Sequence, residues 1–350
     1  MACLTNYVGH EQSGDSKMRL EQVDIDEWGE LLPRSGFEIF HTPEALAVLD
    51  EHADASLRLY GVFKGQEAVG LFPAFVRSHR VGRTVTSPPP SMTVPRLGPL
   101  VMPASPKQRK RESVTWEAVD LFLEELDLDA TRTLLHLQCP LAYEDPRPFQ
   151  WSDLRVEQAF TYVLDLSETT PEAVRDGFSR DLRKELRQRD DADISVSIEG
   201  DDAAGLVYDD VAGRYAEQEE TFPVERAFFR DIVEALGDRC RVYVARDATG
   251  EYLSGLVVLY SNDTASFWQG GVRASQDGIS VNSVLHWAVI SDMLSDEGPD
   301  VSGYDLVGAN TPRLCRYKSK FGADLVPYYT VESSGTQMSV AKRAYSLVNR

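Results

Sequence analysis

Two stretches of the sequence decide how its fold is interpreted: Tyr304-Asp305-Leu306-Val307-Gly308 and Arg316-Tyr317-Lys318-Ser319-Lys320-Phe321-Gly322. The first predicts a strand that ends at a glycine, and residues 312–320 predict a short cationic helix. A lysine close to a reacting carbonyl group stabilises the negative charge that develops on its oxygen. The alternative is an ordinary surface helix whose long cationic side chains lie beside an aromatic ring.

The residues before this segment predict a sheet with helices around it. Residues 241–246, 252–260 and 265–272 predict three antiparallel strands, residues 281–295 a helix, and residues 325–331 a final strand. A strand, glycine turn and strand at 241–260 resemble a similar unit at 58–76, and a helical stretch precedes each of them. We interpret the two units as a duplication, with a chance likeness of two hairpins as the alternative.

A chain of 350 residues suits two domains. We expect a loose lead-in at 1–21, a first domain at 22–155, a second at 156–332 and a peripheral tail at 333–350. The fold class expected is α/β, with a twisted mixed sheet flanked by helices in each domain.

The formal net charge of −20 arises from 56 acidic residues against 36 Lys and Arg. Such a surface stays solvated in molar salt, so we expect a cytoplasmic protein adapted to potassium chloride, as in a haloarchaeon. An ordinary acidic enzyme is the alternative. The same charge disfavours an extended nucleic-acid interface, although a transient tRNA contact through a local basic surface is compatible with it.

The remaining composition excludes several classes of protein. The four cysteines and six histidines are scattered without a metal or disulfide pattern, so we expect no metal. We find no apolar run long enough to span a membrane and no secretory signal at the N-terminus. The oligomeric state cannot be inferred from these features.

A basic helix is predicted at 174–189, where Arg180, Arg183, Lys184 and Arg187 recur at spacings of three and four and share one face. Guanidinium groups match phosphate oxygens in pairs, which favours a phosphate-bearing ligand. A solvated face paired with neighbouring carboxylates is an equal alternative.

The junction between the strand at 265–272 and the next helix is a candidate donor site. Gln269, Gly270, Gly271 and Val272 end the strand, and paired glycines let a backbone approach a ligand closely. The helix that follows begins near Asn282, and its free N–H groups favour an anion. A turn that merely needs glycines is the simpler interpretation.

Taken together, the segments at 162–166, 178–187, 304–308 and 316–323 resemble the FemAB-like (BioF2-like acetyltransferase domain) branch of the GNAT acyltransferases. This branch includes the aminoacyltransferases that build peptidoglycan cross-bridges. The resemblance covers residues 162–329 and implies two tandem GNAT-like domains. It also implies transfer of an acyl or aminoacyl group to the amine of a small-molecule acceptor.

The resemblance implies a role for each candidate residue. Lys318 and Tyr317 would be catalytic, and Arg180, Arg183, Arg187 and Arg316 would bind phosphates or other substrate groups. Gln269, Gly270, Gly271, Val272 and Asn282 would line the donor cleft, with acyl-CoA (acetyl-CoA) or aminoacyl-tRNA as donor. The loop after Gly271 departs from the GNAT pyrophosphate pattern, which weakens coenzyme A as donor. Asp305 and His286 are candidate bases but suit structural roles better, so a non-catalytic binding paralogue is the second hypothesis.

Overall fold

The computed structural model describes residues 17–128, 132–188, 193–272 and 274–333. The first half contains β1 (Met18–Val23), α1 (Ile25–Leu31), α2 (Pro43–His52), β2 (Ser56–Lys64), β3 (Glu67–Ser78), β4 (Arg83–Ser87), β5 (Leu100–Val101), α3 (Gln108–Leu126), β6 (Thr133–Gln138), α4 (Arg147–Trp151) and β7 (Arg155–Asp165). Helices α5 (Pro171–Gly177) and α6 (Arg180–Arg187) connect it to the second half.

The second half contains β8 (Ser195–Glu199), α7 (Asp201–Glu217), α8 (Arg226–Leu236), β9 (Cys240–Arg246), β10 (Tyr252–Tyr260), β11 (Thr264–Gly270), β12 (Ser275–Gln276), β13 (Ile279–Ser280), α9 (Val281–Met293), β14 (Gly303–Asp305), α10 (Pro312–Lys318) and β15 (Asp324–Glu332). Apart from the short strands β5, β12 and β13, the order of helices and strands repeats that of the first half. This repetition is what the duplication hypothesis predicts.

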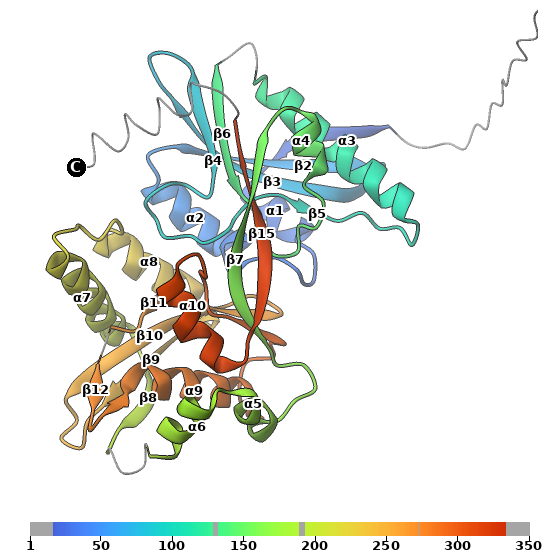
Figure 1. Cartoon of the computed structure of the whole chain (residues 1–350). Coiled ribbons are helices and arrows are strands. Elements are labelled where there is room, and N and C mark those ends of the chain that lie inside the picture. Colours follow the sequence, from blue (N-terminus) through green and yellow to red (C-terminus); the bar gives the residue numbers. More distant parts are fainter. Residues whose placement is uncertain (1–16, 129–131, 189–192, 273, 334–350) are drawn as a thin grey trace, which may run out of the picture.

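One mixed sheet runs through the described part of the molecule in the order β1-β2-β3-β4-β6-β15-β7-β14-β11-β10-β9-β8, with β5 beside β3 (Figure 1). The last strand of each half pairs with the other half. Strand β7 pairs with β14, and β15 pairs with β6 as well as with β7. The two halves are therefore joined by an exchange of their closing strands. The expected mixed α/β sheet flanked by helices is confirmed.

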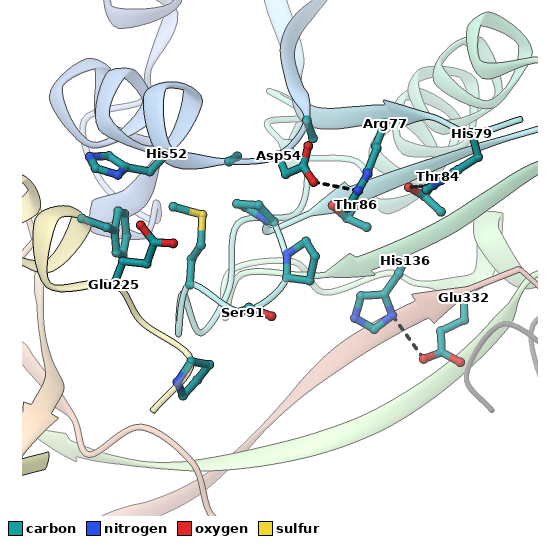
Figure 2. Close-up of a pocket in the computed structure, with 17 residues that line it drawn as sticks. His52, Asp54, Arg77, His79, Thr84, Thr86, Ser91, His136, Glu225 and Glu332 are labelled. Carbon is teal, nitrogen blue, oxygen red and sulfur yellow. Dashed lines mark hydrogen bonds and ion pairs between the residues drawn. The ribbon is translucent and has the colours of Figure 1, made fainter. Parts of the chain in front are cut away.

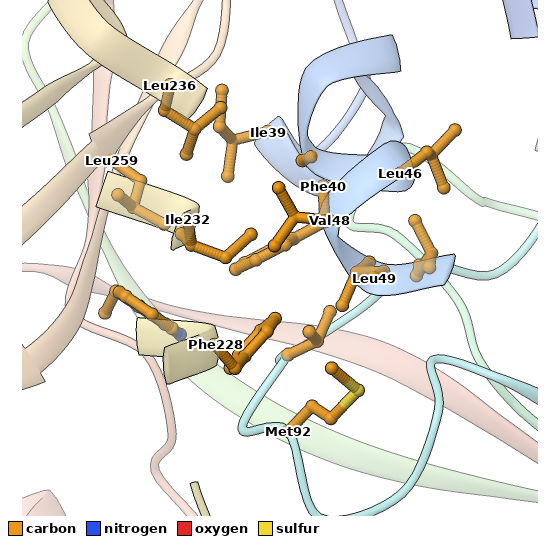
Figure 3. Close-up of a cluster of buried hydrophobic side chains, with 14 of the residues drawn as sticks. Ile39, Phe40, Leu46, Val48, Leu49, Met92, Phe228, Ile232, Leu236 and Leu259 are labelled. Carbon is orange, nitrogen blue, oxygen red and sulfur yellow. The ribbon is translucent and has the colours of Figure 1, made fainter. Parts of the chain in front are cut away.

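The halves also share a hydrophobic core between α2 and α8. Ile39 and Phe40 precede α2 and lie in the same buried cluster as Phe228 and Ile232 of α8 (Figure 3). Trp268 of β11 stacks on Phe229 at a ring separation of 4.9 Å in this cluster. On the opposite faces, α3 covers the first half of the sheet, and α6 and α9 cover the second. Burial across the interface fixes the position of each half relative to the other.

Side-chain caps explain where several helices begin. Thr42, Thr170, Ser280 and Thr311 each accept a hydrogen bond from the backbone N–H three residues ahead, at the starts of α2, α5, α9 and α10. These caps satisfy N–H groups that have no partner within the helix.

The single helix expected at 174–189 is wrong, because the chain forms α5 and α6 with a break between them. The Ser179 N–H donates to the Lys320 carbonyl at 2.8 Å, and the Ser179 hydroxyl caps α6. A tertiary partner thus takes the amide that a continuous helix would use. The apolar side chains of this segment are nevertheless buried, including Phe178 and Leu182.

The ends of the chain also differ from expectation. Strand β1 pairs with β2 from Met18 onward, so ordered structure starts before residue 22. Of the predicted tail at 333–350, only Ser333 lies among the described residues. Its hydroxyl accepts a hydrogen bond from the Leu135 N–H at 2.8 Å.

Candidate functional site

The parallel strands β11 and β14 pair over only three residues and then separate. After the pair Ser266 and Asp305, the chain from β14 turns toward β7 instead. The Leu306 N–H donates to the Tyr162 carbonyl at 2.9 Å, and the Ala309 N–H donates to the Phe160 carbonyl at 3.0 Å. A cavity of about 610 Å³ opens between the separating strands, at the carboxyl ends where ligands commonly bind in such sheets.

The equivalent gap in the first half is filled by the chain itself. Strands β4 and β6 are parallel, like β11 and β14. Beyond them, the Leu97 and Gly98 N–H groups both donate to the Gln138 carbonyl, at 3.1 and 2.7 Å. A Cβ at Gly98 would lie 2.8 Å from that oxygen, so only glycine allows this close approach. The open cleft between parallel strands thus lies in the second half.

Lys318 binds the backbone of the segment that leaves the sheet after β14. From α10, its Nζ donates to the carbonyls of Leu306 (2.6 Å), Val307 and Gly308 (2.8 Å). An ammonium has three donors, and these three carbonyls use all of them. Burial lowers the pKa of Lys318 to about 8, although Asp305 opposes the shift. At neutral pH the side chain is therefore charged and bound to the backbone at the wall of the cavity.

The side chain of Tyr317 carries a buried hydroxyl beside this cavity, close to Ser283. This residue also lines the cavity, and its buried hydroxyl has no hydrogen-bond partner among the described residues. Burial raises the pKa of Tyr317, with Ser283 close enough to oppose the shift, so the hydroxyl keeps its proton. A buried, unpartnered hydroxyl is costly unless a ligand satisfies it.

His286 lines the same cavity but is a poor proton acceptor. Its Nδ1 lies 2.9 Å from the Tyr304 hydroxyl, and its ring packs on Phe267 and Phe321. Burial lowers the pKa of His286 to about 3, and the charge of Lys318 adds to this effect. The imidazole is thus a neutral packing residue, as the sequence suggested.

Asp305 belongs to a buried ion network that joins the two halves. The Arg96 guanidinium, 1% exposed, bonds to the Asp305 carboxylate and to both oxygens of Glu38, at 2.7 and 3.1 Å. Burial acts to raise the pKa of Glu38, but Arg96 holds it below its ordinary value. Asp305 also accepts the Thr161 hydroxyl and, at 2.8 Å, the Val307 N–H. The network fixes the start of the segment that Lys318 binds.

Four of the five donor-site candidates line the cavity: Gln269, Gly270, Gly271 and Asn282. Gly270 has a φ of 114°, and a Cβ there would lie 2.1 Å from the Gly255 carbonyl oxygen. The Asn282 side chain donates to the Gly271 carbonyl at 2.7 Å. Val272 lies outside the lining, where its carbonyl accepts the Ser254 hydroxyl at 3.4 Å.

The predicted phosphate-binding arginines lie away from this cavity. Arg180, Arg183, Arg187 and Arg316 are absent from its lining, and the Arg183 guanidinium donates to the Asp176 carbonyl at 2.8 Å. Arg214 of α7 and Arg313 of α10 line it instead, together with an adjoining cavity of about 270 Å³. Neither forms an ion pair with the described carboxylates. Arg214 is the single cation of α7, so the sequence offered no local signal for it, whereas Arg313 belongs to the predicted cationic helix at 312–320 but has no predicted role there.

A second cavity, of about 580 Å³, lies between the halves on the side of α2 and α8 (Figure 2). His136 contacts Glu332 at 3.1 Å and Arg77 contacts Asp54 at 2.7 Å in its wall. Thr93 separates this cavity from the first. It follows Met92 of the second cavity, and it accepts hydrogen bonds from Trp268 and Gln269 of the first, at 3.1 and 2.7 Å.

Neither a metal-binding cluster nor a membrane-spanning helix occurs among the residues that the structure describes. In that part of the chain, no three or more His, Cys, Asp or Glu side chains gather in a way that could hold a metal ion. There, too, every helix is too short or too polar to cross a lipid bilayer.

The cleft geometry agrees with the comparison of this sequence with known families. Residues 176–319 match the acetyltransferase (GNAT) domain family. The match includes α6, both separating strands and Lys318. It covers less than half of the chain, and a search of curated proteins finds no match.

Solved structures resemble almost the whole chain. The structure of FemX has a TM-score of 0.67 at 11% identity, covering 95% of this chain and all of that one. L-PGS from Bacillus licheniformis has a TM-score of 0.56 at 12% identity, covering 94% and 98%. The C-terminal domain (DUF2156) of a putative lysylphosphatidylglycerol synthetase from Agrobacterium fabrum has a TM-score of 0.55 at 12% identity, covering 93% and 96%. At these identities the likeness establishes a shared fold.

Proposed function

We propose that the protein is an N-acyltransferase of the FemAB-like type. It would transfer an acetyl or aminoacyl group to the amino group of a polar acceptor that carries phosphate or sugar. The observation that carries this proposal is the open cleft between β11 and β14, whose lining includes Tyr317 with a buried hydroxyl that has no hydrogen-bond partner among the described residues. The GNAT match over the same residues supports it.

The proposed reaction needs the amine and the acyl carbonyl held in contact. The amine nitrogen forms a bond to the carbonyl carbon, the ester or thioester bond breaks, and the amine proton passes to solvent or the leaving group. Proximity supplies much of the acceleration. The protonated Tyr317 hydroxyl would donate a hydrogen bond to the carbonyl oxygen as it becomes negative. Lys318 would act through the segment 306–308 that it positions.

The donor would be acyl-CoA, such as acetyl-CoA, or an aminoacyl-tRNA, with Gln269, Gly270, Gly271 and Asn282 lining its site. Arg214 and Arg313 would meet phosphates at the cavity, whereas the exposed arginines of α6 could make a transient tRNA contact outside it. Both donors belong to the cytoplasm, the compartment we propose. The excess of acidic residues supports adaptation to high salt.

A second candidate is a binding protein without catalytic activity. It is favoured by the fact that all three Lys318 donors are occupied and that His286 is a poor base. Such a protein would keep the cleft and recognise a phosphate-bearing ligand.

Mass spectrometry of reaction products separates the two candidates. The protein is incubated in molar potassium chloride with acetyl-CoA or aminoacyl-tRNA and a set of amine-bearing sugars and nucleotides. Acyl transfer that is reduced in Tyr317→Phe supports the enzyme. Binding of a phosphate-bearing ligand without transfer from either donor supports the second candidate.

A further inference from the structure

The N-terminus of α9 borders the cleft, and a side chain of the protein already holds it. Glu185 of α6 accepts the Ser280 N–H at 2.6 Å through one carboxylate oxygen and the Ser283 hydroxyl at 3.2 Å through the other. Helix N-termini attract anions because their N–H groups are unpaired and the helix dipole is positive there. In this protein the group at the N-terminus of α9 is the Glu185 carboxylate, a side chain of the protein itself.

Two further N–H groups at this junction also have hydrogen-bond partners within the protein. The Val281 N–H donates to the Ala274 carbonyl at 3.1 Å, and the Ser283 N–H donates to the Ser280 hydroxyl at 3.3 Å. The preceding loop is folded as the β12–β13 hairpin, in which Ser275 pairs with Ser280. Residues 275–276 are therefore paired with residues 279–280 in this loop, directly before α9.

The Glu185 carboxylate contacts the start of α9 although cationic side chains lie on its own helix. Helix α6 carries Arg183, Lys184 and Arg187, yet among the described residues no lysine or arginine forms an ion pair with Glu185. Within the described part of the chain, the hydrogen-bond donors to its carboxylate are the Ser280 N–H and the Ser283 hydroxyl at the start of α9. A second anion at the same place would meet a like charge at close range.

We propose that Glu185 determines donor specificity by occupying the place of a donor phosphate at α9. The inference rests on the proposed function for placing a donor in this cleft. It follows that pyrophosphate-bearing thioesters such as acetyl-CoA bind poorly, and that an accepted donor has no phosphate at this position. Its phosphates face Arg214 and Arg313 elsewhere in the cavity.

Calorimetric titration with acetyl-CoA tests the proposal without requiring turnover. We expect weak or unsaturable binding by the unaltered protein, and binding tighter by at least about tenfold in Glu185→Ala, which frees the amide and removes the like charge. Glu185→Gln keeps the size of the side chain and should gain less. Asp181→Asn, an exposed acidic position on the same helix, is the matched control and should behave like the unaltered protein.

Tight acetyl-CoA binding by the unaltered protein would overturn the proposal, and so would equally weak binding by both folded Glu185 variants. Circular dichroism of each variant establishes folding before titration. The result is independent of the transfer assay. A gain of acetyl-CoA binding without any acyl transfer would leave the inference standing and reject the proposed function. Acyl transfer without a gain of acetyl-CoA binding in the variants would support the proposed function and reject the inference.

Discussion

Replacing Arg96 by methionine tests the network that joins the two halves. Methionine keeps most of the side-chain volume but leaves the carboxylates of Glu38 and Asp305 buried without their cation. Removing one partner of a buried ion pair costs about 3–5 kcal/mol. At a urea dependence of about 3 kcal/mol per molar, the unfolding midpoint should fall by roughly 1 to 1.7 M. Because the pair is buried, molar salt should not erase the effect.

The loss should depend on pH in a defined direction. Arg96 lowers the pKa of Glu38 in the native protein, so this stabilisation is present above about pH 4.3, the ordinary value for Glu, and is lost as pH falls through the lowered pKa. In Arg96→Met the lowering by Arg96 is lost while the effect of burial remains, so the pKa of Glu38 rises. The folded variant then takes up a proton at a higher pH than the unaltered protein does, which relieves its penalty. The stability difference should be largest near pH 7 and smaller near pH 4.

Urea unfolding at pH 7 and pH 5, followed by tryptophan fluorescence, measures both effects. Arg80→Met is the control, since Arg80 is exposed and should change stability little. Adding Glu38→Gln and Asp305→Asn to Arg96→Met should recover most of the loss. A loss below 1 kcal/mol at pH 7, or one that grows on acidification, would refute the reasoning.

Three further predictions concern the cleft. Tyr317→Phe should lower kcat by about 10- to 100-fold with KM and unfolding midpoint nearly unchanged, as steady-state kinetics would measure; an unchanged kcat would remove the hydroxyl from the mechanism. Activity should fall as pH rises through about 8, because Lys318 loses the proton that serves its third carbonyl, and a pH–rate profile of Lys318→Met should lack this falling limb. The double variant Arg214→Ala with Arg313→Ala should bind a phosphate-bearing ligand about tenfold more weakly and with a smaller salt dependence, whereas Arg187→Ala should bind it like the unaltered protein. Equal losses of affinity in the double variant and in Arg187→Ala, measured by calorimetry, would contradict the assignment.

Much of the fold follows from local patterns in the sequence. The two hairpins contain continuous β-branched and aromatic runs around glycine turns, and the structure has them at β2–β3 and β9–β10. The break before α6 could not be predicted, because it depends on a hydrogen bond between Ser179 and Lys320. Gly322, with a φ of 68°, allows this contact, since a Cβ there would lie 2.6 Å from the Gly177 carbonyl oxygen.

The candidate site, like the fold, has features that the sequence predicted and features that it did not. Tyr317, Lys318 and the glycines after Gln269 lie in segments with a recognisable order, and the structure brings them to one cavity. Their hydrogen-bond partners were not predictable. Glu185 looked like one charge in a mixed helix, and Arg96 lies 209 residues from Asp305. Such pairs depend on tertiary geometry, which periodicity and spacing do not encode.

The exchange of closing strands has a consequence for biosynthesis. The first half is translated early, but the partner that covers the edge of β6 is β15, among the last residues that the structure describes. Until β15 leaves the ribosome, β6 has an open edge that can pair with other chains. The nascent first half should therefore need a chaperone, and a chain that stops before Asp324 should leave both halves incomplete. The two halves repeat each other in architecture, yet the sheet of the first half is closed by a strand from the second.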